Sequence, residues 1–160
     1  MLKTYEPAQI LNALASTSAA LTQRKEEINR LNVFPVPDGD TGTNMSLTIE
    51  SVVNNLRSLG SDADGQAVRK AIIQGALMGA RGNSGVITSQ ILRGLCEGSD
   101  GLDQFDTETI AASLQKAEEV AFQAVRKPVE GTILTVLRDT AKAAKDAAAL
   151  GLDTDAAMEA

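Results

Sequence analysis

Residues 32–45 read Asn-Val-Phe-Pro-Val-Pro-Asp-Gly-Asp-Thr-Gly-Thr-Asn-Met, and this stretch interrupts the helical pattern on either side of it. Pro35 and Pro37 fix their own φ near about −65° and push the residues before them into extended geometry, so no helix continues through the segment. Side chains two apart in an extended run face the same side, which predicts that the carboxylates of Asp38 and Asp40 lie together. The glycine between them lets a ligand approach the backbone.

Two carboxylates on a stiff loop are typical ligands of Mg²⁺, which takes one or two carboxylates and completes its shell with water and phosphate oxygens. An acidic surface turn is the alternative, because Pro, Asp, Gly, Thr and Asn are common turn residues. The paired prolines and the following Thr41-Gly42-Thr43-Asn44 favour a binding site. Asp38 and Asp40 are therefore the candidate metal-ligating and catalytic residues.

The composition narrows the possible functions. A chain of 160 residues is long enough for one domain with its own core, and 43% hydrophobic content with 2% aromatics predicts a core of closely packed small side chains. The net charge of −6 provides no basic surface, so no nucleic-acid partner is expected. The chain has no histidine, which excludes a histidine general base, a Ser-His-Asp triad and the commonest zinc ligand sets.

The sequence predicts a cytoplasmic location. No apolar run is long enough for a transmembrane segment, and residues 1–3 do not begin a signal-peptide core. The single cysteine, Cys96, cannot form an internal disulfide, which is typical of a reducing compartment. We expect Cys96 to be a small residue on the apolar side of a helix.

The spacing of apolar residues predicts an all-α fold of six to eight helices. Gly60 to Gly65 and Gly94 to Gly101 are expected to be linkers, and Asp106 and Asp153 are expected to cap the helices that follow them. The last helix starts close to Ala160 without a partner, which predicts a domain that is incomplete at its C-terminal end. The helices are expected at about 7–31, 43–59 (with Thr43 as N-cap), 66–77, 84–95, 107–125, 132–150 and from 153 onward.

Three helix starts follow polar loops that contain glycine, at residues 41–44, 82–85 and 130–132. A helix N-terminus presents free backbone N–H groups and the positive end of the helix dipole, which together attract phosphate. If the three starts converged beside the two aspartates, they would hold metal and phosphates as phosphoryl transfer requires. Taken singly, each threonine or serine is also explained as a plain N-cap.

These motifs resemble a known kinase family. Leu31 to Met45 is similar to the nucleotide-binding (DhaL-type) domain of the dihydroxyacetone kinase superfamily, and the proline pair resembles the version found in the amino-terminal domain of bacterial fatty acid kinases. Residues 79–87 and 130–132 match the family in order and rough spacing. The resemblance covers nearly the whole chain, so residues 1–160 are expected to be one nucleotide-binding kinase domain.

The resemblance implies an antiparallel barrel of helices that binds ATP or ADP and two Mg²⁺ ions at one end. The family holds the metals with three carboxylates: two fall on Asp38 and Asp40, and the third falls near Asn32, a neutral amide. The dihydroxyacetone enzymes have a histidine where this chain has Thr41, which favours the fatty acid branch. The implied nucleotide-binding residues are Thr41, Thr43, Asn44, Gly82, Asn83, Ser84 and Thr132.

In the fatty acid branch a separate fatty-acid-binding protein presents the acyl carboxylate, and the full-length protein is a possible homodimer. A carboxylate acceptor is already ionised near pH 7, so it needs no general base. Three alternatives remain open. The chain could be a glycerone kinase-type nucleotide domain, a non-catalytic helical module that responds to nucleotide, or a phosphoaspartyl hydrolase whose nucleophile lies in Asp38-Gly39-Asp40-Thr41.

Overall fold

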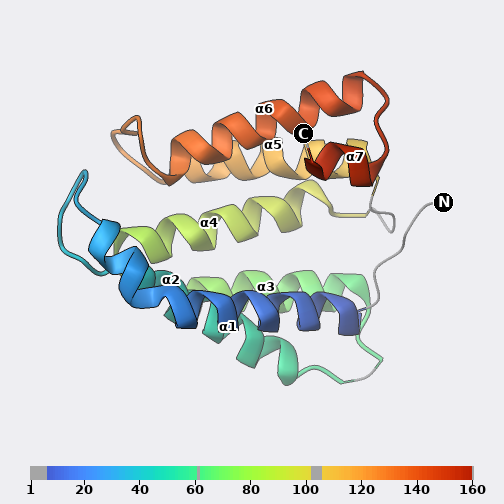
Figure 1. The fold of residues 1–160 in the computed structure, drawn as a ribbon. Coiled ribbons are helices and arrows are strands. Elements are labelled where there is room, and N and C mark those ends of the chain that lie inside the picture. The colour runs from blue at the N-terminus through green and yellow to red at the C-terminus, as the bar shows by residue number, and fades with distance from the viewer. Residues whose placement is uncertain (1–6, 61, 102–105, 160) are drawn as a thin grey trace.

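A computed structural model describes residues 7–60, 62–101 and 106–159, and these ranges contain helices and no strand. The predicted all-α, DhaL-like fold is confirmed (Figure 1). A phosphoaspartyl hydrolase is disfavoured, because its nucleophile follows a buried strand and the residues before Asp38 form none. The helices are α1 (Pro7–Leu31), α2 (Thr41–Arg57), α3 (Gly65–Gly79), α4 (Gly82–Gly98), α5 (Thr107–Gln123), α6 (Ile133–Ala149) and α7 (Thr154–Glu159).

The long helices run antiparallel to their neighbours in the chain, and each packs on the next (Figure 1). α4 lies in the middle, with α2 and α3 on one side and α5 on the other. α6 covers the far side of α5. Within the described ranges no extensive contact joins α1 to α6, so the arrangement is open between these two helices.

Two predicted boundaries are wrong. α2 begins at Thr41, so Thr43 is a residue of its first turn and not its N-cap. α4 extends from Gly82 to Gly98, so most of the predicted 94–101 linker is helical. Its glycines serve close packing instead: a Cβ on Gly94 would lie 2.7 Å from the Ala117 backbone nitrogen on α5. Small residues are used here because the two helix backbones approach each other closely.

Local capping signals were predicted correctly at three helix starts. The Asp106 carboxylate accepts from the Thr109 N–H at 2.7 Å, and this bond lowers the pKa of Asp106. The Asp153 carboxylate accepts from the Ala156 N–H at 2.8 Å in front of α7. Thr132 is the N-cap of α6. Each start is determined by a side chain that satisfies a free backbone N–H of the first turn.

Two clusters of buried apolar residues form the core. The second cluster joins α4, α5 and α6. Leu134 in the first turn of α6 lies in this cluster, and Ile87 near the start of α4 packs against it. The starts of α4 and α6 are therefore at the same end of the molecule (Figure 1). Cys96 is buried in the first cluster, as predicted, and burial raises the pKa of its thiol to about 11.

Candidate functional site

The loop between α1 and α2 is held by Asn32. Its Nδ2 donates to the Val36 carbonyl at 2.9 Å, and its Oδ1 accepts from the Asp40 N–H at 3.3 Å. Both ends of the carboxamide therefore support the loop, and the oxygen keeps one lone pair. The structure assigns Asn32 a loop-holding role, and its role as a metal ligand remains a prediction.

The two aspartates flank Gly39, which has φ +66°. The backbone is not extended at this glycine, so the argument from strand-like alternation does not hold here. Asp38 is exposed, and Asp40 is half-buried at the N-cap of α2 without making a side-chain capping bond. Neither carboxylate bonds to another residue that the structure describes. Both are available to a ligand, and their convergence on one ion remains a prediction.

Asn29, on the last turn of α1, contacts the predicted site residue Thr43, and sequence reasoning did not single it out. Its Oδ1 accepts from the Thr43 N–H at 3.1 Å, and its Nδ2 donates to Thr43 Oγ1 at 3.0 Å. Gly42 permits this contact, because a Cβ there would lie 3.0 Å from the Ile28 Cβ and would also meet the Lys25 carbonyl oxygen. The available sequence signal was an asparagine inside a helical turn, where its propensity is poor.

The starts of α2 and α4 meet. The Asn44 side chain lies directly against Gly82, where a Cβ would be 2.9 Å from the Asn44 Cγ. Ser84 Oγ approaches the Thr41 carbonyl at 3.5 Å, which is a long hydrogen bond. Gly82 has φ +57°, a conformation that glycine adopts without strain. Two of the three predicted helix starts are thus side by side, with Asn83 exposed at their edge.

Asn44 carries an unpaired donor at this junction. The residue is only 8% exposed, and its Nδ2 has no hydrogen-bond partner among the residues that the structure describes. A buried unpaired donor costs about 1–3 kcal/mol, so such a group is expected to have an external acceptor. It lies between two helix N-termini, where N–H groups and the helix dipoles favour an anion. The residues at this end fit a bound phosphate.

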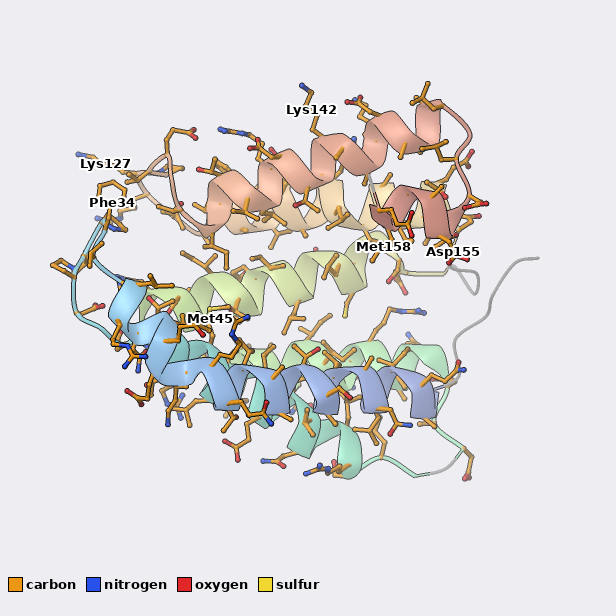
Figure 2. All side chains as sticks on the ribbon, viewed as in Figure 1. Phe34, Met45, Lys127, Lys142, Asp155 and Met158 are labelled. Atoms are coloured by element: carbon orange, nitrogen blue, oxygen red, sulfur yellow. The ribbon has the colours of Figure 1, made fainter. Side chains whose placement is uncertain are left out.

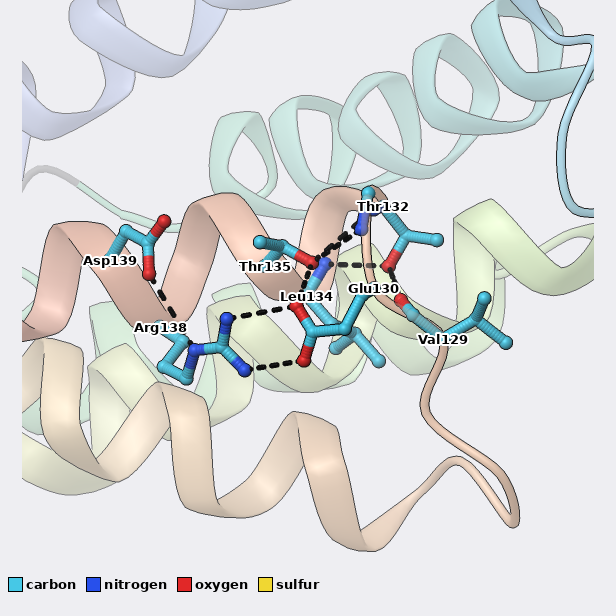
Figure 3. A network of polar contacts seen from close by, with 8 residues as sticks. Val129, Glu130, Thr132, Leu134, Thr135, Arg138 and Asp139 are labelled. Carbon is cyan, nitrogen blue, oxygen red and sulfur yellow. Dashed lines mark hydrogen bonds and ion pairs between the residues drawn. The ribbon is translucent and has the colours of Figure 1, made fainter.

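The start of α6 differs from the other two (Figure 3). Thr132 Oγ1 donates to the Val129 carbonyl at 2.8 Å and accepts from the Leu134 N–H at 3.3 Å. The N–H groups of Gly131 and Thr132 donate to Thr135 Oγ1 at 2.9 Å and 3.4 Å. These donors are satisfied within the loop, so a phosphate at Thr132 would have to replace bonds that already exist.

A charged pair completes this network. Arg138 donates two hydrogen bonds to Glu130 at 2.6 Å and 2.9 Å, and Thr135 Oγ1 donates to the same carboxylate at 3.1 Å (Figure 3). The Arg138 guanidinium lowers the pKa of Glu130, and the carboxylate raises the pKa of Arg138. Arg138 therefore holds the 129–132 loop through the carboxylate of Glu130.

The loops that precede α2, α4 and α6 lie at the same end of the molecule (Figure 1). Figure 2 shows Phe34 of the first loop and Lys127 of the loop before α6 at this end, and Asp155 and Met158 of α7 at the other. No group of three or more His, Cys, Asp or Glu residues suited to a metal occurs in the described ranges. A metal ion here would be held by two carboxylates and by oxygens of its own ligand.

Fold and site together define an all-helical domain in which the N-termini of α2, α4 and α6 lie at one end (Figure 1). Residues 35–160 match the family model described as the DAK2 domain, and the chain belongs to this family, the DhaL-type domain of the dihydroxyacetone kinase family. This family is part of a kinase superfamily and generally binds nucleotide. None of the helices in the described part of the chain is long and apolar enough to cross a membrane.

Several bacterial proteins are similar to this chain. Protein YloV of Bacillus subtilis is 42% identical over 159 residues, which are 99% of this chain and 29% of that protein. The uncharacterized protein SERP0792 of Staphylococcus epidermidis is 50% identical over 131 residues, which are 79% of this chain and 23% of the relative. The uncharacterized protein SAUSA300_1119 of Staphylococcus aureus is 48% identical over 129 residues, 78% of this chain and 22% of the relative. The chain thus spans 22–29% of the length of these relatives.

Proposed function

We propose that this domain binds ATP with Mg²⁺ and donates the γ-phosphoryl group to a fatty acid carboxylate, which a separate fatty-acid-binding protein presents. The observation that carries the proposal is the unpaired Asn44 Nδ2, buried between the starts of α2 and α4. A triphosphate supplies the acceptor that this donor lacks. Family membership supports nucleotide as the source of that phosphate.

In this proposal Asp38 and Asp40 hold the metal through carboxylates that have no other partner in the described residues. Thr41, Thr43 and Ser84 donate to the phosphates together with the backbone N–H groups of the two helix starts. Bound Mg²⁺ would neutralise the charge that develops on the transferring phosphoryl group. Asn32 acts on the metal site by fixing the Asp40 backbone.

The absence of histidine favours a carboxylate acceptor over a hydroxyl. A hydroxyl acceptor must lose a proton during transfer, which calls for a positioned base. A fatty acid is ionised near pH 7 and needs none. The product would be an acyl phosphate, and the catalytic contribution of this chain would be positioning and charge stabilisation.

Isothermal titration with MgATP tests the nucleotide site. We expect the unaltered chain to bind, and Asp38→Ala/Asp40→Ala to bind at least about tenfold more weakly, because two charge-assisted contacts are lost. The control is Asp146→Ala/Glu159→Ala, which removes the same charge from exposed positions near the C-terminal ends of α6 and α7. Equal affinity of the site variant and the unaltered chain would exclude Asp38 and Asp40 as metal ligands.

A second measurement separates a kinase domain from a non-catalytic nucleotide-responsive module. The chain is mixed with MgATP and a bacterial fatty-acid-binding protein loaded with palmitate, and ADP release is followed. A kinase domain gives ADP release that depends on both the chain and the loaded protein. Nucleotide binding with no ADP release in the complete mixture supports the non-catalytic module.

A further inference from the structure

We infer that Asn29 is a positioning residue that orients the Thr43 hydroxyl as a hydrogen-bond donor toward bound phosphate. The inference rests on the proposed function, because it names a residue on α1 that prepares the nucleotide site. It begins from the two hydrogen bonds that join the Asn29 carboxamide to Thr43, at 3.1 Å and 3.0 Å.

These two bonds determine which end of the carboxamide faces which atom. The Thr43 backbone N–H can only donate, so it must face the Asn29 oxygen. The amide nitrogen of Asn29 then faces the Thr43 hydroxyl and donates to it. The hydroxyl is the acceptor in this bond, and its own proton remains available to another acceptor.

Five other helical threonines donate that proton to a carbonyl of their own helix. The hydroxyls of Thr17, Thr22, Thr48, Thr88 and Thr140 each donate to the carbonyl four residues earlier, at 2.8–2.9 Å. Four residues before Thr43 is Gly39, which lies outside α2 in a left-handed conformation. No described residue accepts the Thr43 proton. Thr43 therefore differs from these threonines, because its hydroxyl proton has no acceptor among the described residues.

The Asn29 contact is held by backbone packing. Gly42 allows the first turn of α2 to pack closely against α1. A Cβ added at Gly42 would lie 3.1 Å from Asn29 Oδ1. Asn44, the next residue after Thr43, provides the unpaired donor beside Gly82. Thr43 and Asn44 thus each have a hydrogen-bond donor that no described residue accepts, and both lie in the same helical turn. α1 contributes to the site through Asn29 without contacting the phosphate itself.

Asn29→Asp tests this direction of donation. An aspartate of the same shape still accepts from the Thr43 N–H, but its second oxygen takes the hydroxyl proton. Thr43→Val removes the hydroxyl and keeps the backbone bond. We measure MgATP affinity by titration for both single variants and the double variant, with circular dichroism to verify the helix content of each. Each single variant is expected to bind about tenfold or more weakly, as for loss of one hydrogen bond to a charged group.

The double-mutant cycle separates positioning from charge. The negative charge of Asn29→Asp acts in both backgrounds and cancels, whereas its effect on the hydroxyl exists only when Thr43 is present. We expect the combined loss to be at least about fivefold smaller than the product of the single losses. As control, Asn29→Asp with Thr140→Val should show no coupling. Independent effects in the Asn29 and Thr43 cycle would overturn the inference.

Two further outcomes are decisive. If Asn29→Asp loses helix content, Thr43→Val and Thr43→Ser decide, because neither alters Asn29. Weak binding by the valine variant with recovery by the serine variant supports a donating hydroxyl, and unchanged binding by both overturns it. If the unaltered chain does not bind MgATP, both the proposed function and this inference fall. If it binds and the cycle shows no coupling, only the inference falls.

Discussion

Gly82→Ala perturbs the fold and the site at one position. Gly82 has φ +57°, and a Cβ there would meet the Asn44 carboxamide, with the Cγ at 2.9 Å. Because Asn44 is only 8% exposed, its side chain has little room to move away. We expect the alanine to strain the start of α4 and to displace the unpaired donor from the junction with α2.

The magnitude is the sum of two terms. A left-handed conformation costs a residue other than glycine about 1–2 kcal/mol. Overpacking against a buried side chain costs about 1–3 kcal/mol more. Gly82→Ala should therefore lower the free energy of unfolding by about 2–5 kcal/mol. In addition, loss of the Asn44 donor should weaken MgATP binding by about tenfold or more.

Gly151→Ala is the matched control. Gly151 has φ +68°, and a Cβ there would have no atom within 4 Å, so this position has the conformational cost without the contact. It follows α6 near α7, at the opposite end from the site. We expect about 1–2 kcal/mol of destabilisation and unchanged MgATP affinity for this variant.

Urea unfolding followed by circular dichroism gives the free energies, and titration gives the affinities. The difference between the two alanine variants isolates the contact with Asn44, because both lose the same unfolded-state freedom of glycine. Equal stability of the two variants, or an unchanged MgATP affinity of Gly82→Ala, would refute the reasoning that Asn44 and Gly82 form the site.

Three other predictions concern packing and burial away from the site. Gly94→Ala should lower the free energy of unfolding by about 1–3 kcal/mol, because the new Cβ meets the Ala117 nitrogen at 2.7 Å on a helix backbone that cannot yield. Gly60→Ala, with nothing within 4 Å, should leave stability unchanged or raise it by about 0.4–1 kcal/mol in the same urea experiment. For Cys96, burial raises the thiol pKa from 9.0 to about 11, so the stability gained by keeping the thiol protonated is complete below pH 9.0 and is lost as the pH rises toward 11. Iodoacetamide at about pH 8 should label Cys96 only in the unfolded chain, and rapid labelling of the native chain would contradict its burial.

The sequence was sufficient for features that depend on neighbouring residues. Apolar spacing identified the helices, and short-range chemistry identified the caps at Asp106, Thr132 and Asp153. In each case the donor and acceptor lie two or three residues apart. The burial of Cys96 also followed from its place on a periodic apolar face. Interactions between residues this close in the sequence can be predicted without knowing the tertiary fold.

Features that depend on distant contacts were missed. Gly94 and Gly98 were interpreted as linker residues. Glycine occurs both in turns and at close contacts between helices, so the residue type alone does not distinguish the two. The presence of α5 beside α4 decides between the two, and the sequence does not reveal it. Asn29 was overlooked for a similar reason, since its partner Thr43 is fourteen residues away. A polar side chain inside a helix gives no indication of which distant backbone it caps.

The three helix starts that look alike in the sequence differ in whether their hydrogen-bond donors already have acceptors. Asn44 Nδ2 on α2 has no partner in the described part of the chain, whereas the hydroxyl and the N–H of Thr132 are already bonded within their own loop. Under the proposed function, phosphate gains new hydrogen bonds at the junction of α2 and α4 and only exchanges existing ones at α6. The exchange at α6 also disturbs Thr135, whose hydroxyl donates to the Glu130 carboxylate that Arg138 holds. Under that proposal the junction of α2 and α4 would therefore supply most of the affinity, and the start of α6 would contribute only by breaking bonds within its own loop.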